Sequence, residues 1–168
     1  IIDASNLERN LYLTAQLLEM RVPMIIVVNM MDIARQHKLE IDLDRMAAEL
    51  GCPVLGVVAS RESGVDELKK AVDAMIAKQA VPPLPFQYSS DISAVIEDLG
   101  SRLEKSGQKH GRWNATQILE GAAPAEPLPE AVEQAMPEIR KPVESYGSDL
   151  DIAIADARYQ FASQLIEK

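Results

Sequence analysis

The first half of the chain alternates continuous apolar runs with stretches of helical period. The runs Met24-Ile-Ile-Val-Val28 and Val54-Leu-Gly-Val-Val58 lack polar alternation, which is typical of strands in a sheet that helices cover on both faces. Ile1-Ile2 reads as the end of a further strand. A helical period follows each of these runs, at residues 5–20, 42–50 and 65–76. This alternation predicts an α/β fold with a parallel sheet.

Local signals predict how these helices begin and end. Ser5-Asn-Leu-Glu8 has the spacing of a capping box, in which a serine hydroxyl and a glutamate carboxylate satisfy each other's backbone amides. Gly51 stands where the second helix is expected to end in the left-handed conformation. The third helix carries its apolar residues on one face: Val65, Leu68, Val72, Met75 and Ile76.

The composition changes at Val81-Pro-Pro-Leu-Pro85, where the prolines exclude a helix and favour a stiff extended segment. Beyond it the chain shows helical periods and no strand-like run. The last helix has the clearest period, with Leu150, Ile154, Ala157, Phe161 and Leu165 on one side. We therefore expect an α/β domain over residues 1–80, a proline-rich linker over residues 81–87 and an all-α domain over residues 88–168.

Composition and charge narrow the classes of partner. The chain has 26 Asp and Glu residues against 17 Lys and Arg, a net charge of −9, with no basic stripe to neutralise phosphates. Nucleic acid is therefore excluded as a partner. A single cysteine, Cys52, cannot form an internal disulfide and indicates a reducing compartment. No apolar run reaches the ~20 residues that a membrane-spanning helix needs.

Polar residues follow the predicted strands, at the sheet edge where ligands of open parallel sheets bind. Asn29 and Asp32 come after the second strand, and Ala59-Ser60 comes after the third. A carboxylate can accept hydrogen bonds from the ring N–H and the exocyclic amine of guanine, and a backbone amide at Ala59 or Ser60 can donate to the guanine carbonyl oxygen. Adenine lacks that double donor edge, so the three groups together favour guanine.

These residues resemble the base-reading motifs of small GTPases. Asn29-Met-Met-Asp32 looks like their Asn-Lys-x-Asp motif, and Val58-Ala-Ser60 followed by Gly64-Val65 looks like their Ser-Ala-Lys loop. Met30 replaces the lysine whose stem packs along the purine face. Methionine can supply that apolar contact but not the charge, so weaker nucleotide binding is expected. The resemblance places Asn29, Met30, Asp32, Ala59 and Ser60 at the base.

A closer resemblance is to the bacterial ferrous iron transport protein B family. It rests on segments spread along nearly the whole chain: Asp3 to Leu13, Asn29 to Ile33, Leu50 to Val54, Arg112-Trp113, Ile118 to Gly121 and Ile154 to Tyr159. It implies a small-GTPase-like (P-loop NTPase) half domain that binds GTP and GDP, followed by a helical domain that slows GDP release. It also implies a place on the cytoplasmic side of the bacterial inner membrane, with the membrane-embedded iron permease of the parent protein as partner.

The same resemblance identifies what this sequence lacks. The family's glycine-rich phosphate loop, its first switch and its Asp-x-x-Gly motif do not occur in residues 1–168. Mg²⁺ is expected in the intact parent, with ligands outside this chain. The chain begins without methionine at what reads as a strand end, so we expect a fragment that reads the base and does not hydrolyse GTP by itself.

Other interpretations remain open at this stage. Asn29 and Asp32 are also common residues of strand-to-helix turns. His37 and His110 have polar neighbours and are expected at the surface, not at a metal. The rival to nucleotide binding is an interaction module without ligand, in which a bare strand edge pairs with another chain or a homo-oligomer forms.

Overall fold

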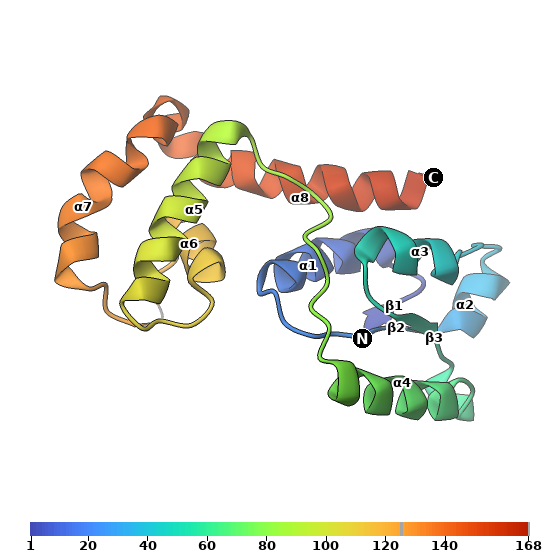
Figure 1. Ribbon diagram of the computed structural model, residues 1–168. Coiled ribbons are helices and arrows are strands. Elements are labelled where there is room, and N and C mark those ends of the chain that lie inside the picture. Colours follow the sequence, from blue (N-terminus) through green and yellow to red (C-terminus); the bar gives the residue numbers. More distant parts are fainter. Residues whose placement is uncertain (125, 168) are drawn as a thin grey trace. The chain divides into compact units, whose positions relative to one another are not determined.

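The computed structural model describes residues 1–124 and 126–167. The chain divides into two units (Figure 1). An α/β unit comprises Ile1–Pro85 together with the segment from Phe161 onward, and a helical unit comprises Phe86–Gln160. None of the helices in the described ranges is long and apolar enough to span a membrane.

The α/β unit is built on a three-stranded parallel sheet. Strands β1 (Ile2–Asp3), β2 (Ile26–Asn29) and β3 (Val54–Gly56) follow one another in the order β1-β2-β3. Residue Val28 pairs with Ile2 on one side and with Gly56 on the other. The parallel sheet predicted from the apolar runs is confirmed, and β2 forms its centre, with Ile26, Val27 and Val28 buried.

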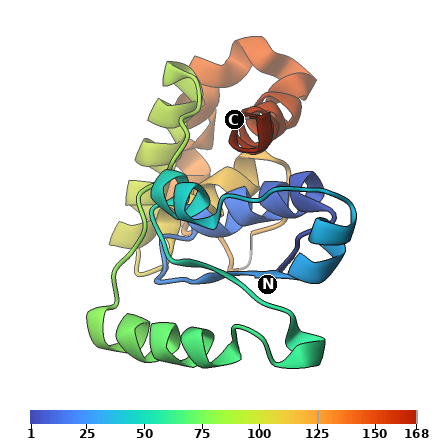
Figure 2. The ribbon, with the colours of Figure 1, turned by 90° about the vertical axis from the view of Figure 1, so that its right-hand side faces the viewer.

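Helices lie on both sides of this sheet (Figures 1 and 2). The elements of the unit are α1 (Leu7–Glu19), α2 (Met31–Gln36), α3 (Leu43–Leu50), the 3₁₀ turn η1 (Ala59–Arg61) and α4 (Val65–Lys78). Helices α1 and α3 are on one side and α4 is on the other. The apolar face of α4 is formed as predicted, but none of its residues is buried, and Ile76 is 61% exposed.

The helix ends confirm one local prediction and correct another. Gly51 has φ 67°, and its amide donates to the Ala47 carbonyl, so it ends α3 as expected. The capping box at Ser5 was wrong, because the Ser5 hydroxyl and amide both donate to Asp3 Oδ1, at 2.7 and 2.8 Å. A carboxylate is a strong acceptor, and Asp3 lies only two residues before Ser5.

The helical unit confirms the all-α prediction. Its elements are α5 (Ser90–Lys105), α6 (Gly111–Leu119), α7 (Glu130–Arg140), the 3₁₀ segment η2 (Lys141–Asp149) and the first part of α8 (Leu150–Glu167). Helix α5 buries apolar residues that recur at helical spacing: Ile92, Val95, Ile96, Leu99 and Leu103. These side chains form the centre of the unit.

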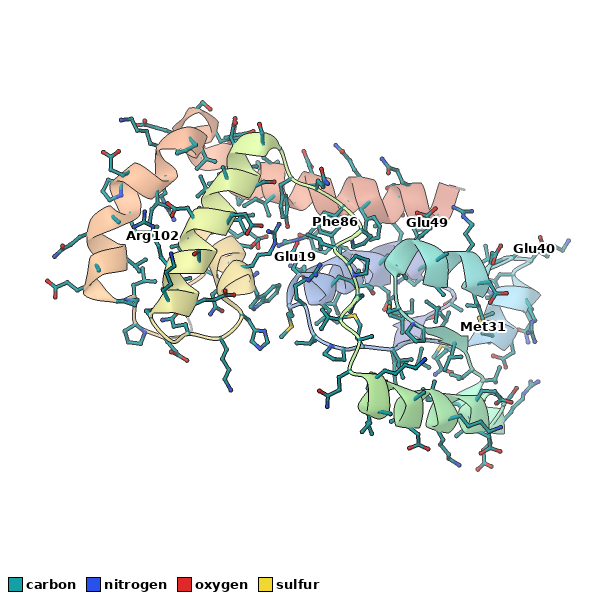
Figure 3. All side chains as sticks on the ribbon, in the orientation of Figure 1. Glu19, Met31, Glu40, Glu49, Phe86 and Arg102 are labelled. Atoms are coloured by element: carbon teal, nitrogen blue, oxygen red, sulfur yellow. The ribbon has the colours of Figure 1, made fainter. Side chains whose placement is uncertain are left out.

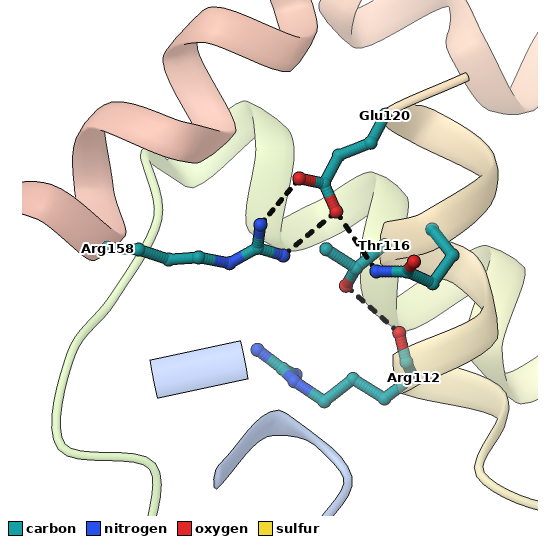
Figure 4. Close-up of polar contacts among 5 residues, drawn as sticks. Arg112, Thr116, Glu120 and Arg158 are labelled. Carbon is teal, nitrogen blue, oxygen red and sulfur yellow. Dashed lines mark hydrogen bonds and ion pairs between the residues drawn. The ribbon is translucent and has the colours of Figure 1, made fainter. Parts of the chain in front are cut away.

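A buried ion pair crosses this centre (Figure 4). The guanidinium of Arg158 donates from Nη1 and Nη2 to the two carboxylate oxygens of Glu120, at 2.5 and 2.9 Å. The side chain of Arg158 is fully buried and that of Glu120 is 17% exposed. Gln117 also donates to Glu120, at 3.1 Å. This arrangement joins the end of α6 to α8 through a charged, two-point contact.

Candidate functional site

Asn29 is the last residue of β2, at the carboxyl edge of the sheet. Its side-chain Oδ1 accepts a hydrogen bond of 3.1 Å from the backbone amide of Ala59. The two residues are thirty positions apart, and they meet because β2 and β3 are parallel neighbours whose carboxyl ends share one edge. The Ala59 amide therefore orients the Asn29 side chain.

Met30 and Asp32 belong to the turn that leads from β2 into α2. Met30 has φ 62° and ψ 34°, a left-handed conformation that ends the strand abruptly, and it is 45% exposed. Asp32 follows in the first turn of α2, where its Oδ1 accepts a 3.1 Å hydrogen bond from the Ile33 amide. Its Oδ2 lies 3.6 Å from Nη2 of Arg61. The neighbouring residue Met31, labelled in Figure 3, starts α2.

The turn η1 connects these two side chains. Ala59 bonds Asn29 and Arg61 pairs with Asp32, so both candidate side chains contact one three-residue segment. Within the described residues, the amide of Ser60, between these two contacts, makes no hydrogen bond. The structure thus brings together Asn29, Asp32 and the Ala59-Ser60 backbone on one edge.

Backbone hydrogen bonds hold the η1 turn in shape. Val58 and Ser63 exchange amide–carbonyl bonds of 3.0 and 3.3 Å across the loop, and the Arg61 amide donates to the Val58 carbonyl at 2.9 Å. Gly64 follows with φ 82°, and a Cβ there would lie 2.5 Å from the Gly56 carbonyl oxygen. Only glycine fits that approach, so the loop returns directly onto the end of β3.

Arg61 is the functional candidate that the motif reading passed over. It lies directly after Ala59-Ser60 in the sequence, and its charge is opposite to that of Asp32. The sequence shows this candidate only as a positively charged residue two positions after Ala59. The parallel sheet is what brings it within reach of a carboxylate twenty-nine positions earlier.

Asp3 ends the first strand at the same edge but has a different partner. The hydroxyl and amide of Ser5 donate to it and hold the pKa of this carboxyl below its usual value. The Ala4 amide donates to the Asn29 carbonyl at 2.9 Å, which ties this end of β1 to β2 through the backbone. Asp3 therefore shapes the loop into α1, although it is the register partner of Asn29 in the sheet.

A cavity of about 620 Å³ in the α/β unit lies apart from the candidate residues. Its lining includes Leu11, Ile41, Arg45 and Met46, and none of Asn29, Asp32 or Ser60. Among the residues that the structure describes, no group of three or more His, Cys, Asp or Glu side chains is arranged to hold a metal ion. The candidate site is thus an open edge of hydrogen-bonding groups.

Two family models match the chain. One describes ferrous iron transport protein B and matches residues 1–72, and the other describes the FeoB cytosolic helical domain and matches residues 88–168. The chain belongs to the ferrous iron transport protein B (FeoB) family. The resemblance identified from the sequence segments is confirmed.

Curated FeoB proteins are similar over nearly all of this chain. The Fe(2+) transporter FeoB of Escherichia coli (strain K12) is 37% identical over 165 residues, which is 95% of this chain and 21% of that protein. The Fe(2+) transporter FeoB of Salmonella typhimurium is 35% identical over 161 residues, with the same two shares. The chain therefore spans about a fifth of the length of these transporters.

Solved FeoB structures share the fold. The cytosolic domain of L. pneumophila FeoB has a TM-score of 0.79 at 30% identity, over 99% of this chain and 64% of that one. NFeoB from S. thermophilus bound to GDP·AlF4⁻ and K⁺ has a TM-score of 0.82 at 29% identity, over 100% of this chain and 67% of that one. These similarities confirm a small-GTPase-like α/β part followed by a helical domain.

Proposed function

We propose that this chain is the guanine-reading part and the helical domain of a cytoplasmic nucleotide-binding domain that regulates ferrous iron transport. One observation carries the proposal: Asn29 and Asp32 both contact the turn Ala59–Arg61. Solved FeoB relatives from S. thermophilus are bound to GDP and to GMPPNP, and the E. coli relative is an Fe(2+) transporter. GTP and GDP are therefore the proposed ligands.

Each polar group at the sheet edge has its own role in the proposed recognition. The Asp32 carboxylate accepts from the ring N–H and the exocyclic amine of guanine, and the free amide of Ser60 donates to its carbonyl oxygen. The Ala59 amide holds Asn29 Oδ1, which leaves the Asn29 amide nitrogen to donate to the ring. The exposed Met30 side chain gives an apolar contact to the purine face.

This arrangement disfavours adenine because the carboxylate oxygens of the site would be left without hydrogen-bond donors. Adenine has no N–H and amine pair for the Asp32 carboxylate, and its exocyclic amine would face the Ser60 amide, so two donors would meet. A polar group that a bound base covers without giving it a hydrogen-bond partner costs about 1–3 kcal/mol. The expected preference for guanine is therefore at least about tenfold.

Phosphate chemistry is proposed only for the longer parent protein. The sequence contains no glycine-rich phosphate loop, and we propose that Mg²⁺ binds in the parent protein through ligands outside this chain. Phosphoryl-transfer catalysis depends mainly on charge stabilisation at the transferred phosphate. We therefore propose GTP hydrolysis for the parent and base reading for this chain.

The helical unit is proposed to slow GDP release and to act toward the membrane permease of the parent. The family match over residues 88–168 and the Fe(2+) transporter relatives support this assignment. We accordingly propose a location on the cytoplasmic side of the bacterial inner membrane. Residues 1–80, 81–87 and 88–168 are the proposed domain, linker and helical domain.

A second candidate is an interaction module without nucleotide. The exposed apolar face of α4, with Val72 36% and Ile76 61% exposed, favours it. Guanine preference separates the two candidates, because a module of this kind has no reason to distinguish guanine from adenine.

The test is an NMR titration of the isotope-labelled chain with GMP, AMP and XMP. Xanthine carries a carbonyl oxygen where guanine carries its amine, so Asp32→Asn offers an amide donor to XMP and loses the match to GMP. We expect GMP affinity to fall by about tenfold and XMP affinity to rise. Asp44→Asn is the matched control, since Asp44 also lies in the first turn of a helix of this unit.

Shift changes in the wild-type chain should map to residues 29–33 and 58–62. Equal binding of GMP and AMP by the wild-type chain would refute the proposal. So would an Asp32→Asn variant whose order of nucleotide affinities is that of the Asp44→Asn control.

A further inference from the structure

We propose that Arg61 is a positioning residue for base recognition, which holds the Asp32 carboxylate in the orientation that reads the exocyclic amine of guanine. The proposal rests on the proposed function, because it concerns the same carboxylate. It adds a residue outside the base-reading set Asn29, Met30, Asp32, Ala59 and Ser60. Arg61 itself is not expected to contact the base.

The two oxygens of Asp32 are held by different groups. Oδ1 accepts the Ile33 amide at 3.1 Å, and Oδ2 faces Nη2 of Arg61 at 3.6 Å. One contact alone would let the carboxylate rotate about its Cβ–Cγ bond, a torsion with a broad, roughly two-fold energy profile. Contacts on both oxygens restrict that rotation and fix the plane in which the carboxylate can accept.

The Arg61 contact leaves Oδ2 able to accept from a ligand. At 3.6 Å it is an ion pair beyond hydrogen-bonding distance, and a carboxylate oxygen has two lone pairs. The Asp32 side chain is 21% exposed, so a ligand can reach it, and Arg61 is 69% exposed. The guanidinium therefore orients the acceptor without occupying it.

Backbone hydrogen bonds hold the segment around Arg61. The Arg61 amide donates to the Val58 carbonyl at 2.9 Å, inside the loop closed by the Val58–Ser63 pair. The same turn presents the Ala59 amide to Asn29 at 3.1 Å. One hydrogen-bonded segment thus contacts both side chains of the β2–α2 turn, and side chains held in place in this way lose less conformational entropy on binding.

The positive charge of Arg61 lies beside the turn at residues 29–32, which carries no cation of its own. Met30 brings no cation to the edge. Among the described residues, Asp32 forms its ion pair with Arg61. Arg35, three residues further along α2, has the same charge and no ion pair to Asp32, which makes it a matched control.

The discriminating ligand pair is GMP and IMP. Hypoxanthine differs from guanine only by lacking the exocyclic amine, so the ratio of their affinities reports the second hydrogen bond to Asp32. A hydrogen bond to a charged group contributes a factor of about ten in affinity. A residue that only attracts the phosphate would change GMP and IMP affinities equally.

The experiment is an NMR titration of the wild-type chain and of Arg61→Gln, Arg61→Lys and Arg35→Gln with GMP and IMP. We expect a GMP-to-IMP affinity ratio of about ten for the wild-type chain and for Arg35→Gln, and about three for Arg61→Gln. Arg61→Lys keeps the charge and should restore part of the ratio.

The outcomes separate this inference from the proposed function. A wild-type chain that binds GMP and AMP equally overturns both. A wild-type chain that prefers GMP, together with an Arg61→Gln variant of unchanged GMP-to-IMP ratio, overturns the role of Arg61 alone. An equal loss of GMP and IMP affinity in Arg61→Gln also overturns it, because it assigns Arg61 to general attraction of the nucleotide.

Discussion

Replacing Glu120 by glutamine should destabilise the helical unit far more than removing a charge at its surface. The substitution keeps the shape of the side chain but removes the negative charge opposite Arg158, whose side chain is fully buried. The guanidinium stays charged in the variant, because arginine does not lose its proton in proteins. Breaking a buried pair by removing one partner costs about 3–5 kcal/mol.

The lower end of that range applies here. Glu120 is 17% exposed, so water can approach the contact, and a glutamine oxygen can still accept one of the guanidinium hydrogens. We therefore expect a loss of about 3 kcal/mol in the free energy of unfolding. This loss is a large fraction of the 5–15 kcal/mol that usually stabilises a domain.

The measurement is urea unfolding followed by tryptophan fluorescence. Trp113 is the only tryptophan of the chain and lies on α6, so its signal reports on the helical unit. Asp98→Asn is the control, because Asp98 pairs with Arg102 at 2.8 Å with the two side chains 47% and 44% exposed. An exposed pair of this spacing contributes about 0.5 kcal/mol. The reasoning is refuted if both variants lose the same stability.

Two further predictions concern the α/β unit. Burial raises the pKa of the Cys52 thiol from its ordinary value of 9.0 to about 11. The folded state therefore keeps a proton that the unfolded state loses, and stability that is complete below about pH 9 should fall as the pH rises toward 11. In urea titrations between pH 9 and pH 11, the Cys52→Ala variant should lose about 2 kcal/mol less free energy of unfolding than the wild-type chain. An equal loss in the two proteins would contradict the role given to Cys52. Gly64→Ala should cost clearly more in thermal unfolding than Gly107→Ala, because both glycines have positive φ but a Cβ meets a carbonyl oxygen at 2.5 Å only at Gly64; equal costs would show that the loop adapts.

The sequence predicts the parts of the fold that depend on one segment at a time. The apolar run ending at Val28 marks a central strand because both of its faces must be covered, and Gly51 marks a helix end because few residues adopt its φ of 67°. Ser5 was assigned the wrong partner since Asp3 and Glu8 compete for it within one short segment, and a pattern does not rank the two.

The sequence patterns could not predict contacts between segments that are distant along the chain. Arg158 follows Ile154 by four residues on the buried side of α8, and its burial depends on Glu120 being carried there by a different helix. Arg61 likewise acquires its partner from the strand order, which places η1 beside the turn at Asp32. A charged residue in a helical period is thus a signal to search for its counter-ion elsewhere in the chain.

The ladder between β2 and β3 consists of three residue pairs, Ile26 with Val54, Val27 with Leu55 and Val28 with Gly56. The alignment of the two loops at the carboxyl edge depends on this short ladder, and a slip by one residue would displace one loop by about 3.3 Å, more than the length of the bond between Ala59 and Asn29. Sequence changes at the opposite end of these strands, such as at Val54, should therefore weaken the proposed nucleotide affinity from a distance, together with the stability of the sheet.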